Sequence, residues 1–425
     1  FKAGAVYLPI EPHFPPVRIE KTLARADCEV ILTEAGSTAT LDEALEALPE
    51  ARKLLLTDAF EHEDVSNLGL DVELDQLAYI YFTSGSTGEP KGAMCEHAGM
   101  VNHMYAKIED LGVREGEVVT QIAPQCFDIS LWQLVAPLLV GGRTLIVDQE
   151  TILQPERFVD LIVDSDVGVV QVVPSYLEVL LTYLDHHPRE LGSLHAVSVT
   201  GEALTLELAQ RWFGSQSGIA LINAYGLTET SDDTNHEVMT EPPVGSVPLG
   251  PAVRNVTIYI VDEHLSPVPL GAPGEITFSG MCVGRGYIND PERTAQAYLD
   301  DPLRPGERLY RSGDFGRWRP DGKLEYLGRR DAQVKIRGFR IEIGEIENTL
   351  VQLDGIRQGA VVITGSDDTN KQLVAFYSGT QRPVAELRDH VGRSLPEYMV
   401  PSAFYWQETL PLTDNGKINR RALRA

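Results

Sequence analysis

A segment rich in glycine and hydroxyl residues, directly after an apolar strand, constrains this chain most. Residues 77–82 (Leu-Ala-Tyr-Ile-Tyr-Phe) are short, apolar and aromatic, and this pattern predicts a buried strand. Residues 84–92 follow as Ser-Gly-Ser-Thr-Gly-Glu-Pro-Lys-Gly. The glycines let backbone N–H groups turn inward, the hydroxyls donate further hydrogen bonds, and Lys91 adds a positive charge. The segment therefore predicts a phosphate-binding loop, with a surface turn as the alternative.

This loop differs from the common P-loop, because Lys91 lacks a glycine before it and a hydroxyl residue after it. The formal net charge of −26 argues against nucleic acid and anionic membranes as partners, so an ATP site must supply its own positive field. The cysteines are scattered without a C-x-x-C pair, and no apolar run reaches membrane length. These features predict a cytoplasmic location.

Length and pattern predict an α/β fold with more than one domain. A chain of 425 residues is too long for one ordinary core. Up to about residue 240, apolar runs alternate with helical stretches, which is typical of parallel sheets covered by helices. The expected strands are 30–32, 54–56, 78–82, 118–119, 144–147, 168–173, 196–199 and 220–222. The expected helices are 155–163, 176–184 and 205–212.

The pattern changes towards the C-terminus. Strands at 256–261 and 274–278, separated by Gly/Pro turns, predict a small β-rich lobe over about 245–327. The expected strands 333–336, 360–363 and 373–377 and the expected helices 344–353 and 383–393 predict a small α+β domain over 332–425. We expect a large domain over 1–328, truncated at its N-terminus, and a hinge at 329–331, which is polar and follows a glycine.

Several ordered motifs accompany the loop. They are Phe127-Asp128-Ile129-Ser130, Asn223-Ala224-Tyr225-Gly226-Leu227-Thr228-Glu229, Tyr310-Arg311-Ser312-Gly313-Asp314, residues 328–338 (Gly-Arg-Arg-Asp-Ala-Gln-Val-Lys-Ile-Arg-Gly) and Asn415-Gly416-Lys417. In this order and spacing, the chain resembles the adenylate-forming superfamily of acyl-CoA synthetases, luciferases and nonribosomal peptide synthetase adenylation domains. The resemblance is closest to the adenylation domains and covers nearly the whole chain.

The resemblance implies a nucleotide site for ATP. Tyr225 would stack on adenine, Asn223 would bind its amino group, and Asp314 would accept both ribose hydroxyls with help from Arg329. The complete implied set is Thr83, Ser84, Gly85, Ser86, Thr87, Gly88, Lys91, Gly201, Glu202, Ala203, Asn223, Ala224, Tyr225, Gly226, Thr228, Asp314, Tyr326, Arg329 and Lys417.

The resemblance also implies the catalytic residues Thr83, Lys91, Glu229 and Lys417. Glu229 would bind Mg²⁺, for which one carboxylate suffices because the ion keeps most of its waters. An alternative for Glu229 is a first-turn helix acid. Lys417 would bridge the α-phosphate and the substrate carboxylate. Its hairpin-like sequence, taken alone, indicates only a solvated turn.

A rotation of the C-terminal domain about Asp331 would then bring residues 335–340 to the site for thioester formation. Gly338 would line the tunnel for a phosphopantetheine arm, where a side chain would obstruct it. The resemblance thus implies a peptidyl carrier protein as partner, and a small MbtH-like protein as a further candidate.

An acyl pocket is implied as well, with Asp128 binding the α-ammonium of an amino acid. The implied pocket residues are Asp128, Ile129, Trp132, Gln171, Ser198, Thr200, Ala224, Asp232, Asp233 and Lys417. Asp232 and Asp233 would favour a second cation, as in diaminobutyrate, ornithine, lysine or arginine. A solvated loop or a helix cap over 231–235 is the alternative, and both interpretations stay open.

The sequence therefore predicts an AMP-forming ligase that activates an amino acid and loads it onto a carrier thiol in natural-product biosynthesis. The alternative within enzymes is an aryl- or acyl-CoA ligase, in which Asp128 would have no ammonium to bind. A non-catalytic ATP-binding domain is the alternative outside enzymes. It would require a broken catalytic set, whereas all the expected residues are in place.

Overall fold

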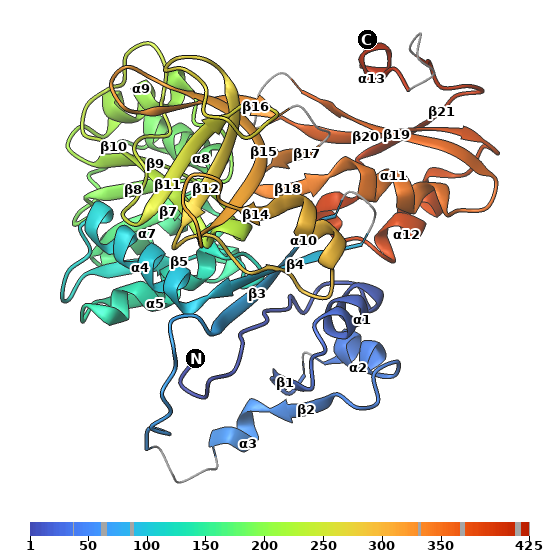
Figure 1. Cartoon of the computed structure of the whole chain (residues 1–425), viewed down its shortest axis with the longest axis horizontal. Coiled ribbons are helices and arrows are strands. Elements are labelled where there is room, and N and C mark those ends of the chain that lie inside the picture. Colours follow the sequence, from blue (N-terminus) through green and yellow to red (C-terminus); the bar gives the residue numbers. More distant parts are fainter. Residues whose placement is uncertain are drawn as a thin grey trace.

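The structure is a computed structural model that describes residues 1–36, 38–60, 66–85, 89–329, 333–365, 370–412 and 418–424 (Figure 1). Among the described residues, six strands form the largest sheet in the order β10-β9-β8-β7-β5-β6. Their bounds are β5 Val118–Gln121, β6 Arg143–Ile146, β7 Val167–Val172, β8 Ala196–Val199, β9 Ala220–Leu227 and β10 Asp232–Met239. All neighbours pair in parallel except β10, which is antiparallel to β9.

Helices cover both faces of this sheet. Helices α7 (Pro155–Asp164), α8 (Pro174–His186) and α9 (Leu206–Ser215) bury Phe158, Leu181 and Trp212 in one apolar cluster with Val170. Helices α4 (His97–Leu111) and α5 (Ile129–Leu139) bury Met104 and Trp132 in a second cluster with Val169. Val169 and Val170 are adjacent on β7, and successive side chains of a strand point to opposite faces. The predicted α/β class is confirmed.

The strand before the glycine-rich loop belongs to a separate sheet. β3 (Leu77–Thr83) pairs antiparallel with β4 (Lys91–Glu96), which pairs with β13 (Gly286–Tyr287). The expectation that the loop follows a strand of the parallel sheet is therefore wrong. The loop joins two antiparallel strands, and β4 escaped prediction because Lys-Gly-Ala-Met-Cys-Glu has little β-branched character.

A β-rich unit follows, as expected. It contains β11 (Val256–Val261), β12 (Gly274–Gly280), β14 (Tyr298–Asp300), β15 (Arg308–Trp318) and β16 (Leu324–Arg329), with α10 (Pro291–Ala297) beside it. The apolar cluster of this unit includes Tyr225 of β9 and Ala93 of β4. The unit is therefore packed directly onto the candidate nucleotide strand.

The N-terminal residues form a small unit with its own core. Strands β1 (Val30–Thr33) and β2 (Arg52–Leu55) pair in parallel, and α1 (Pro16–Arg25) and α2 (Ala39–Leu45) bury Ile19, Leu23 and Leu41. Residue 56, expected at the end of a strand, instead begins the short helix α3 (Leu56–Phe60). A further short helix, α6 (Gln149–Ile152), precedes α7.

The C-terminal residues also have their own core. The hairpin β17–β18 (Gln333–Ile336 and Phe339–Glu342) leads into α11 (Ile343–Val351). A three-stranded sheet follows, with β19 (Ile356–Thr364), β20 (Gln372–Gly379) and β21 (Ala403–Trp406), together with α12 (Val384–Gly392) and α13 (Arg420–Leu423). Ile346, Leu387 and Phe404 share one apolar cluster. In Figure 1 this unit extends away from the large sheet, while the hairpin points back towards it.

Candidate active site

Two adjoining cavities lie beyond the ends of β8 and β9, and they share Thr200, Gly201 and Lys335. The smaller one has a volume of about 100 Å³, and its lining includes Asp128, Ile129, Asp232 and Asp233. The larger one has a volume of about 610 Å³, and its lining includes Glu202, Ala203, Asn223, Ala224, Tyr225, Tyr326 and Arg329. The residues implied for the amino acid and those implied for adenosine thus separate largely into neighbouring cavities.

The aromatic rings of Tyr225 and Tyr326 line the larger cavity, and the buried carboxylate of Asp314 lies behind them without lining it. Tyr225 donates a hydrogen bond from its hydroxyl to Oδ2 of Asp314 at 2.5 Å, and Arg329 donates to Oδ1 at 2.8 Å. The rings of Tyr225 and Tyr326 lie 6.1 Å apart between centroids. Asn223 donates from Nδ2 to the carbonyl of Pro248 at 2.8 Å, which fixes its amide. A carboxylate has about four lone-pair sites, and Tyr225, Arg329 and Tyr326, which donates to Oδ1 at 3.5 Å, use three of them, so a diol would have to displace a tyrosine hydroxyl.

The described part of the glycine-rich loop contacts the C-terminal hairpin and helix α11. Ser84 donates from Oγ to the carbonyl of Arg340 at 2.8 Å and accepts from the N–H of Glu342 at 3.1 Å. The N–H of Gly85 donates to Oε2 of Glu345 at 3.0 Å. The hydroxyl of Thr83 is buried and has no hydrogen-bond partner among the described residues. Positions 86–88 of the predicted phosphate loop lie outside the described residues.

Glu229 is fully buried in the short 3₁₀ helix Thr228–Thr230. Arg340 donates to its Oε2 at 2.7 Å, Tyr287 donates to Oε1 at 2.8 Å, and Nζ of Lys91 lies 3.3 Å from Oε1. Burial opposes ionisation, yet Arg340 and Lys91 hold the pKa of Glu229 well below its ordinary value. Two cations and a hydroxyl thus engage both oxygens, so the carboxylate does not fit a divalent ion in this arrangement.

The tip of hairpin β17–β18 closes over the cavities. The N–H of Gly338 donates to Oε1 of Glu202 at 3.0 Å. Gly338 has φ +79°, and a Cβ there would lie 2.6 Å from Cγ1 of Val173. A Cβ on Gly201 would lie only 3.2 Å from Cα of Gly338. Nζ of Lys335 lies 6.0 Å from the ring centroid of Tyr225. Burial lowers the pKa of Lys335.

The smaller cavity is acidic on two sides. Asp128 caps α5 by accepting the N–H of Ile129 at 3.0 Å, and burial raises the pKa of its carboxyl group. Asp232 and Asp233 are 6% and 2% exposed and begin β10. The alternative of a solvated loop over 231–235 is therefore wrong for these acids. In a regular strand the two side chains would point to opposite faces, but φ values of +57° at Ser231 and +77° at Asp232 bring both carboxylates to the cavity.

Comparison with known proteins places the chain in a family. A family model described as "AMP-binding enzyme" matches residues 1–288, and a second, "AMP-binding enzyme C-terminal domain", matches residues 345–417. The chain belongs to the AMP-binding enzyme family. The recognition of an adenylate-forming enzyme from the motifs is confirmed, and with it the prediction of an AMP-forming ligase.

The relatives of this AMP-binding enzyme include large synthetases. It is 39% identical to a dimodular nonribosomal peptide synthase of Bacillus subtilis (strain 168), over 100% of this chain and 18% of that protein. It is 35% identical to tyrocidine synthase 1 of Brevibacillus parabrevis, over 99% of this chain and 38% of that protein. The chain therefore spans well under half the length of these relatives.

Two solved structures are similar over the whole chain. The Vibrio cholerae adenylation domain AlmE, in complex with glycyl-adenosine-5′-phosphate, has a TM-score of 0.85 and 26% identity, and the match covers 84% of that chain. A four-domain nonribosomal peptide synthetase bound to AMP and glycine has a TM-score of 0.68 and 33% identity, with 31% of that chain covered.

Among the described residues, no helix is both long and apolar enough to cross a bilayer.

Some implied pocket residues lie elsewhere than expected in this AMP-binding enzyme. Gln171 accepts a hydrogen bond from the indole of Trp132, and it borders a separate apolar cavity. Ser198 is fully buried and does not line the small cavity. Ala224 faces the larger, nucleotide-side cavity. Gln171 and Ser198 are register partners on one face of the sheet, and they lie further from the carboxyl ends of the strands than Thr200, which lines both cavities. Lys417 and Asp331 lie outside the described residues.

Sequence reasoning missed the basic residues around these acids. His103 and Lys107 on α4 and His236 on β10 are all buried near Asp233. His103 and Lys107 are four residues apart, so they share one helix face. That spacing was the available signal. Arg340 was expected to face the site, but its pairing with Glu229 depends on a fold contact that the sequence does not reveal.

Proposed function

We propose that this chain activates an amino acid with ATP and then loads it onto the phosphopantetheine thiol of a carrier protein. The observation that carries the proposal is the pair of adjoining cavities, one acidic and small, the other lined by aromatic rings beside a fixed carboxylate. A substrate carboxylate between them would attack the α-phosphorus of ATP. The new bond joins carboxyl oxygen to phosphorus, the bond to the β-phosphate oxygen breaks, and pyrophosphate leaves.

Asp128 supports an amino acid as the substrate. Its carboxylate is half-buried at the start of α5, and a desolvated charge is costly unless an opposite charge accompanies it. The α-ammonium of an amino acid supplies that charge, whereas a fatty or aryl acid does not. The AlmE structure carries a glycyl adenylate, and the four-domain synthetase carries AMP and glycine. These ligands favour the same substrate class for this chain.

The nucleotide roles follow from the contacts of the larger cavity. Tyr225 and Tyr326 would hold the adenine, and Asp314, oriented by Arg329, would accept the ribose hydroxyls. The buried hydroxyl of Thr83 and the ammonium of Lys91 are suited to a phosphate. Lys417 would bridge the two reacting groups. ATP chemistry generally employs Mg²⁺, but Arg340, Tyr287 and Lys91 already engage both oxygens of Glu229, so this carboxylate does not fit the ion here.

The arrangement of the hairpin supports thioester formation. Residues 335–340 face the cavities, as the rotation about Asp331 would require. An apolar cavity of about 220 Å³ continues from Gly338 and Phe339 past Val173 and Tyr176. We propose that it receives the pantetheine arm of a carrier domain.

The test is amino-acid-dependent exchange of labelled pyrophosphate into ATP, with a panel of amino acids and with benzoate and hexanoate. We expect exchange with one or a few amino acids, and its loss in Asp128→Ala. Exchange with benzoate or hexanoate alone would contradict the proposal and favour a CoA ligase. Loading is tested separately by comparing a carrier protein with free CoA as thiol acceptor.

A further inference from the structure

A buried lysine forms an ion pair with Asp233, which lines the smaller cavity. Lys107 is fully buried on α4, and its Nζ lies 2.6 Å from Oδ2 of Asp233. The same ammonium donates to Oγ of Ser198 at 3.4 Å and lies 5.1 Å from the ring centroid of Trp132. Thr200 donates to the other Asp233 oxygen at 3.0 Å. Both oxygens of Asp233 are thus engaged from within the chain.

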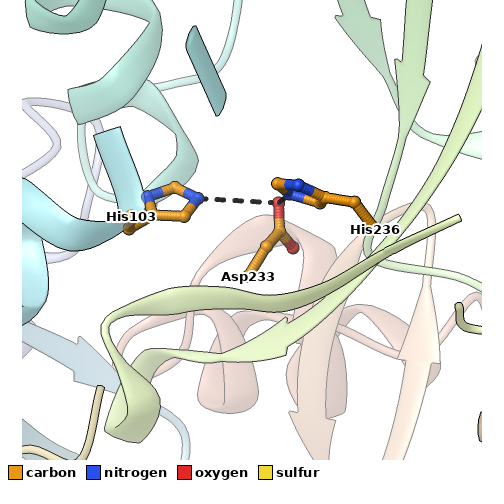
Figure 2. A group of neighbouring side chains, drawn as sticks. All are labelled: His103, Asp233 and His236. Carbon is orange, nitrogen blue, oxygen red and sulfur yellow. Dashed lines mark ion pairs between the residues drawn. The ribbon is translucent and has the colours of Figure 1, made fainter. Parts of the chain in front are cut away.

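Two histidines flank this ion pair, on opposite sides of the Asp233 carboxylate (Figure 2). Nε2 of His103 and Nε2 of His236 lie 3.8 and 3.9 Å from Oδ2 of Asp233. Such a group could hold a metal ion, since its donor atoms lie within 4.8 Å of one another. The Lys107 ammonium, however, already lies against the same carboxylate oxygen and supplies the positive charge. Burial lowers the pKa of His103 to about 4, so this ring is neutral at pH 7.

Asp232 differs from Asp233 although the two are adjacent. It lines the same cavity and is 6% exposed, but among the described residues no lysine or arginine forms an ion pair with it, whereas Lys107 pairs with Asp233. The nearest basic atom recorded for it is Nδ1 of His103, at 3.6 Å. Among the described residues, the cavity therefore presents two acids, Asp128 and Asp232, that form no ion pair with a lysine or arginine.

We propose that Lys107 is a specificity-determining residue that neutralises Asp233, so that Asp232 alone selects the substrate side chain. This inference rests on the proposed function, and it assigns a short diamino acid such as 2,4-diaminobutyrate or ornithine as the substrate. The α-ammonium binds Asp128 and the side-chain ammonium binds Asp232. The small volume of the cavity, about 100 Å³, favours a short side chain over that of arginine.

The test is the ratio of kcat/KM for 2,4-diaminobutyrate over its uncharged isostere norvaline in pyrophosphate exchange. We expect the wild type to favour the diamino acid and Asp232→Asn to lose this preference by roughly 10- to 100-fold. Asp233→Asn leaves the Lys107 charge unpaired beside the substrate amine, so the ratio falls by at least about tenfold.

The double variant Lys107→Met/Asp233→Asn decides the role of Lys107. It removes both partners of a buried pair, which proteins tolerate better than removal of one. We expect it to restore the ratio to within about threefold of the wild type, because the two residues are in contact and coupled: Lys107→Met removes the charge that Asp233→Asn leaves unpaired. A merely structural lysine would alter kcat for both amino acids and leave the ratio unchanged.

Three results would overturn the inference: a wild-type preference for norvaline, an Asp232→Asn variant that keeps the diamino preference, or a double variant that stays as poor as Asp233→Asn. If the wild type exchanges with no amino acid at all, the proposed function itself fails and this inference with it. That outcome is distinct, because a failure of the inference alone leaves exchange with some amino acid intact.

Discussion

Replacing Arg340 by methionine tests what holds the hairpin β17–β18 against the candidate site. The guanidinium donates to Glu229 at 2.7 Å, and the two side chains are 12% and 0% exposed. Methionine keeps most of the aliphatic stem, so the change removes mainly the charge and its hydrogen bonds. The remaining contacts of the hairpin, from Glu202 and Ser84, stay in place.

The expected cost follows from the partners that Glu229 keeps. Removing one member of a buried pair costs about 3–5 kcal/mol when the other charge is left alone. Glu229 retains Lys91 at 3.3 Å and Tyr287 at 2.8 Å, so it is not left alone. We therefore expect Arg340→Met to weaken docking of the hairpin by about 2 kcal/mol, which corresponds to a roughly 30-fold smaller equilibrium constant for docking.

Native-state hydrogen exchange measures this docking at single amides. The N–H of Gly338 donates to Glu202 and that of Glu342 to Ser84, so both are protected only while the hairpin is docked. We expect both to exchange about 30-fold faster in Arg340→Met, with the amides of β20 unchanged. The control is Arg317→Met, which breaks an ion pair with Glu325 whose arginine is 45% exposed. Unchanged Gly338 exchange would refute the reasoning, as would equal acceleration in β20.

Three further predictions use other parts of the molecule. Burial lowers the pKa of His103 from 6.5 to about 4, so the unfolded state binds more protons between these values, and stability present above pH 6.5 is lost as the pH falls. Urea unfolding should show a loss of about 2 kcal/mol from pH 7 to pH 5 that is absent in His103→Gln. Asp314→Asn should raise the KM for ATP about 10- to 150-fold, measured by pyrophosphate exchange at saturating amino acid, because charge-assisted bonds to the ribose are lost. An unchanged KM would remove Asp314 from the nucleotide site. Gly338→Val should slow carrier loading in a single-turnover assay and leave pyrophosphate exchange near the wild-type rate, because a Cβ would lie 2.6 Å from Val173 and φ is +79°. Equal slowing of both steps would argue for misfolding.

Much of the fold could be predicted from pattern alone. Helices α7, α8 and α9 each bury one continuous apolar face, and strands β7 and β8 are apolar runs buried on both faces, so these elements and β11 follow the sequence pattern closely. Helix α4 could not be found in this way. Its buried residues include His103 and Lys107, so its inner face lacks the apolar spacing that indicates an amphipathic helix.

In the candidate site, too, some residues could be predicted from the sequence and others could not. Motifs contiguous in sequence, such as 223–229, indicated residues that the structure brings to one place, because a single strand and turn carry them. The sequence pattern does not indicate which distant segments are in contact. Lys107 and Asp233 are 126 positions apart, and Glu229 and Arg340 are 111 apart. Their pairing depends on how α4 and the C-terminal hairpin pack, which propensity does not encode.

The hydrogen bond from Gly85 to Glu345 has a consequence for the order of events. The carboxylate of Glu345 already accepts a hydrogen bond from the loop that we expect to bind a triphosphate. Arg18 neutralises this carboxylate, with Nη1 at 2.5 Å from Oε1. A bound triphosphate would therefore compete with helix α11 for the N–H of Gly85. By thermodynamic reciprocity, each weakens the other by an equal factor. A high concentration of ATP would favour separation of the C-terminal unit from the glycine-rich loop, and departure of pyrophosphate would allow the contact to form again.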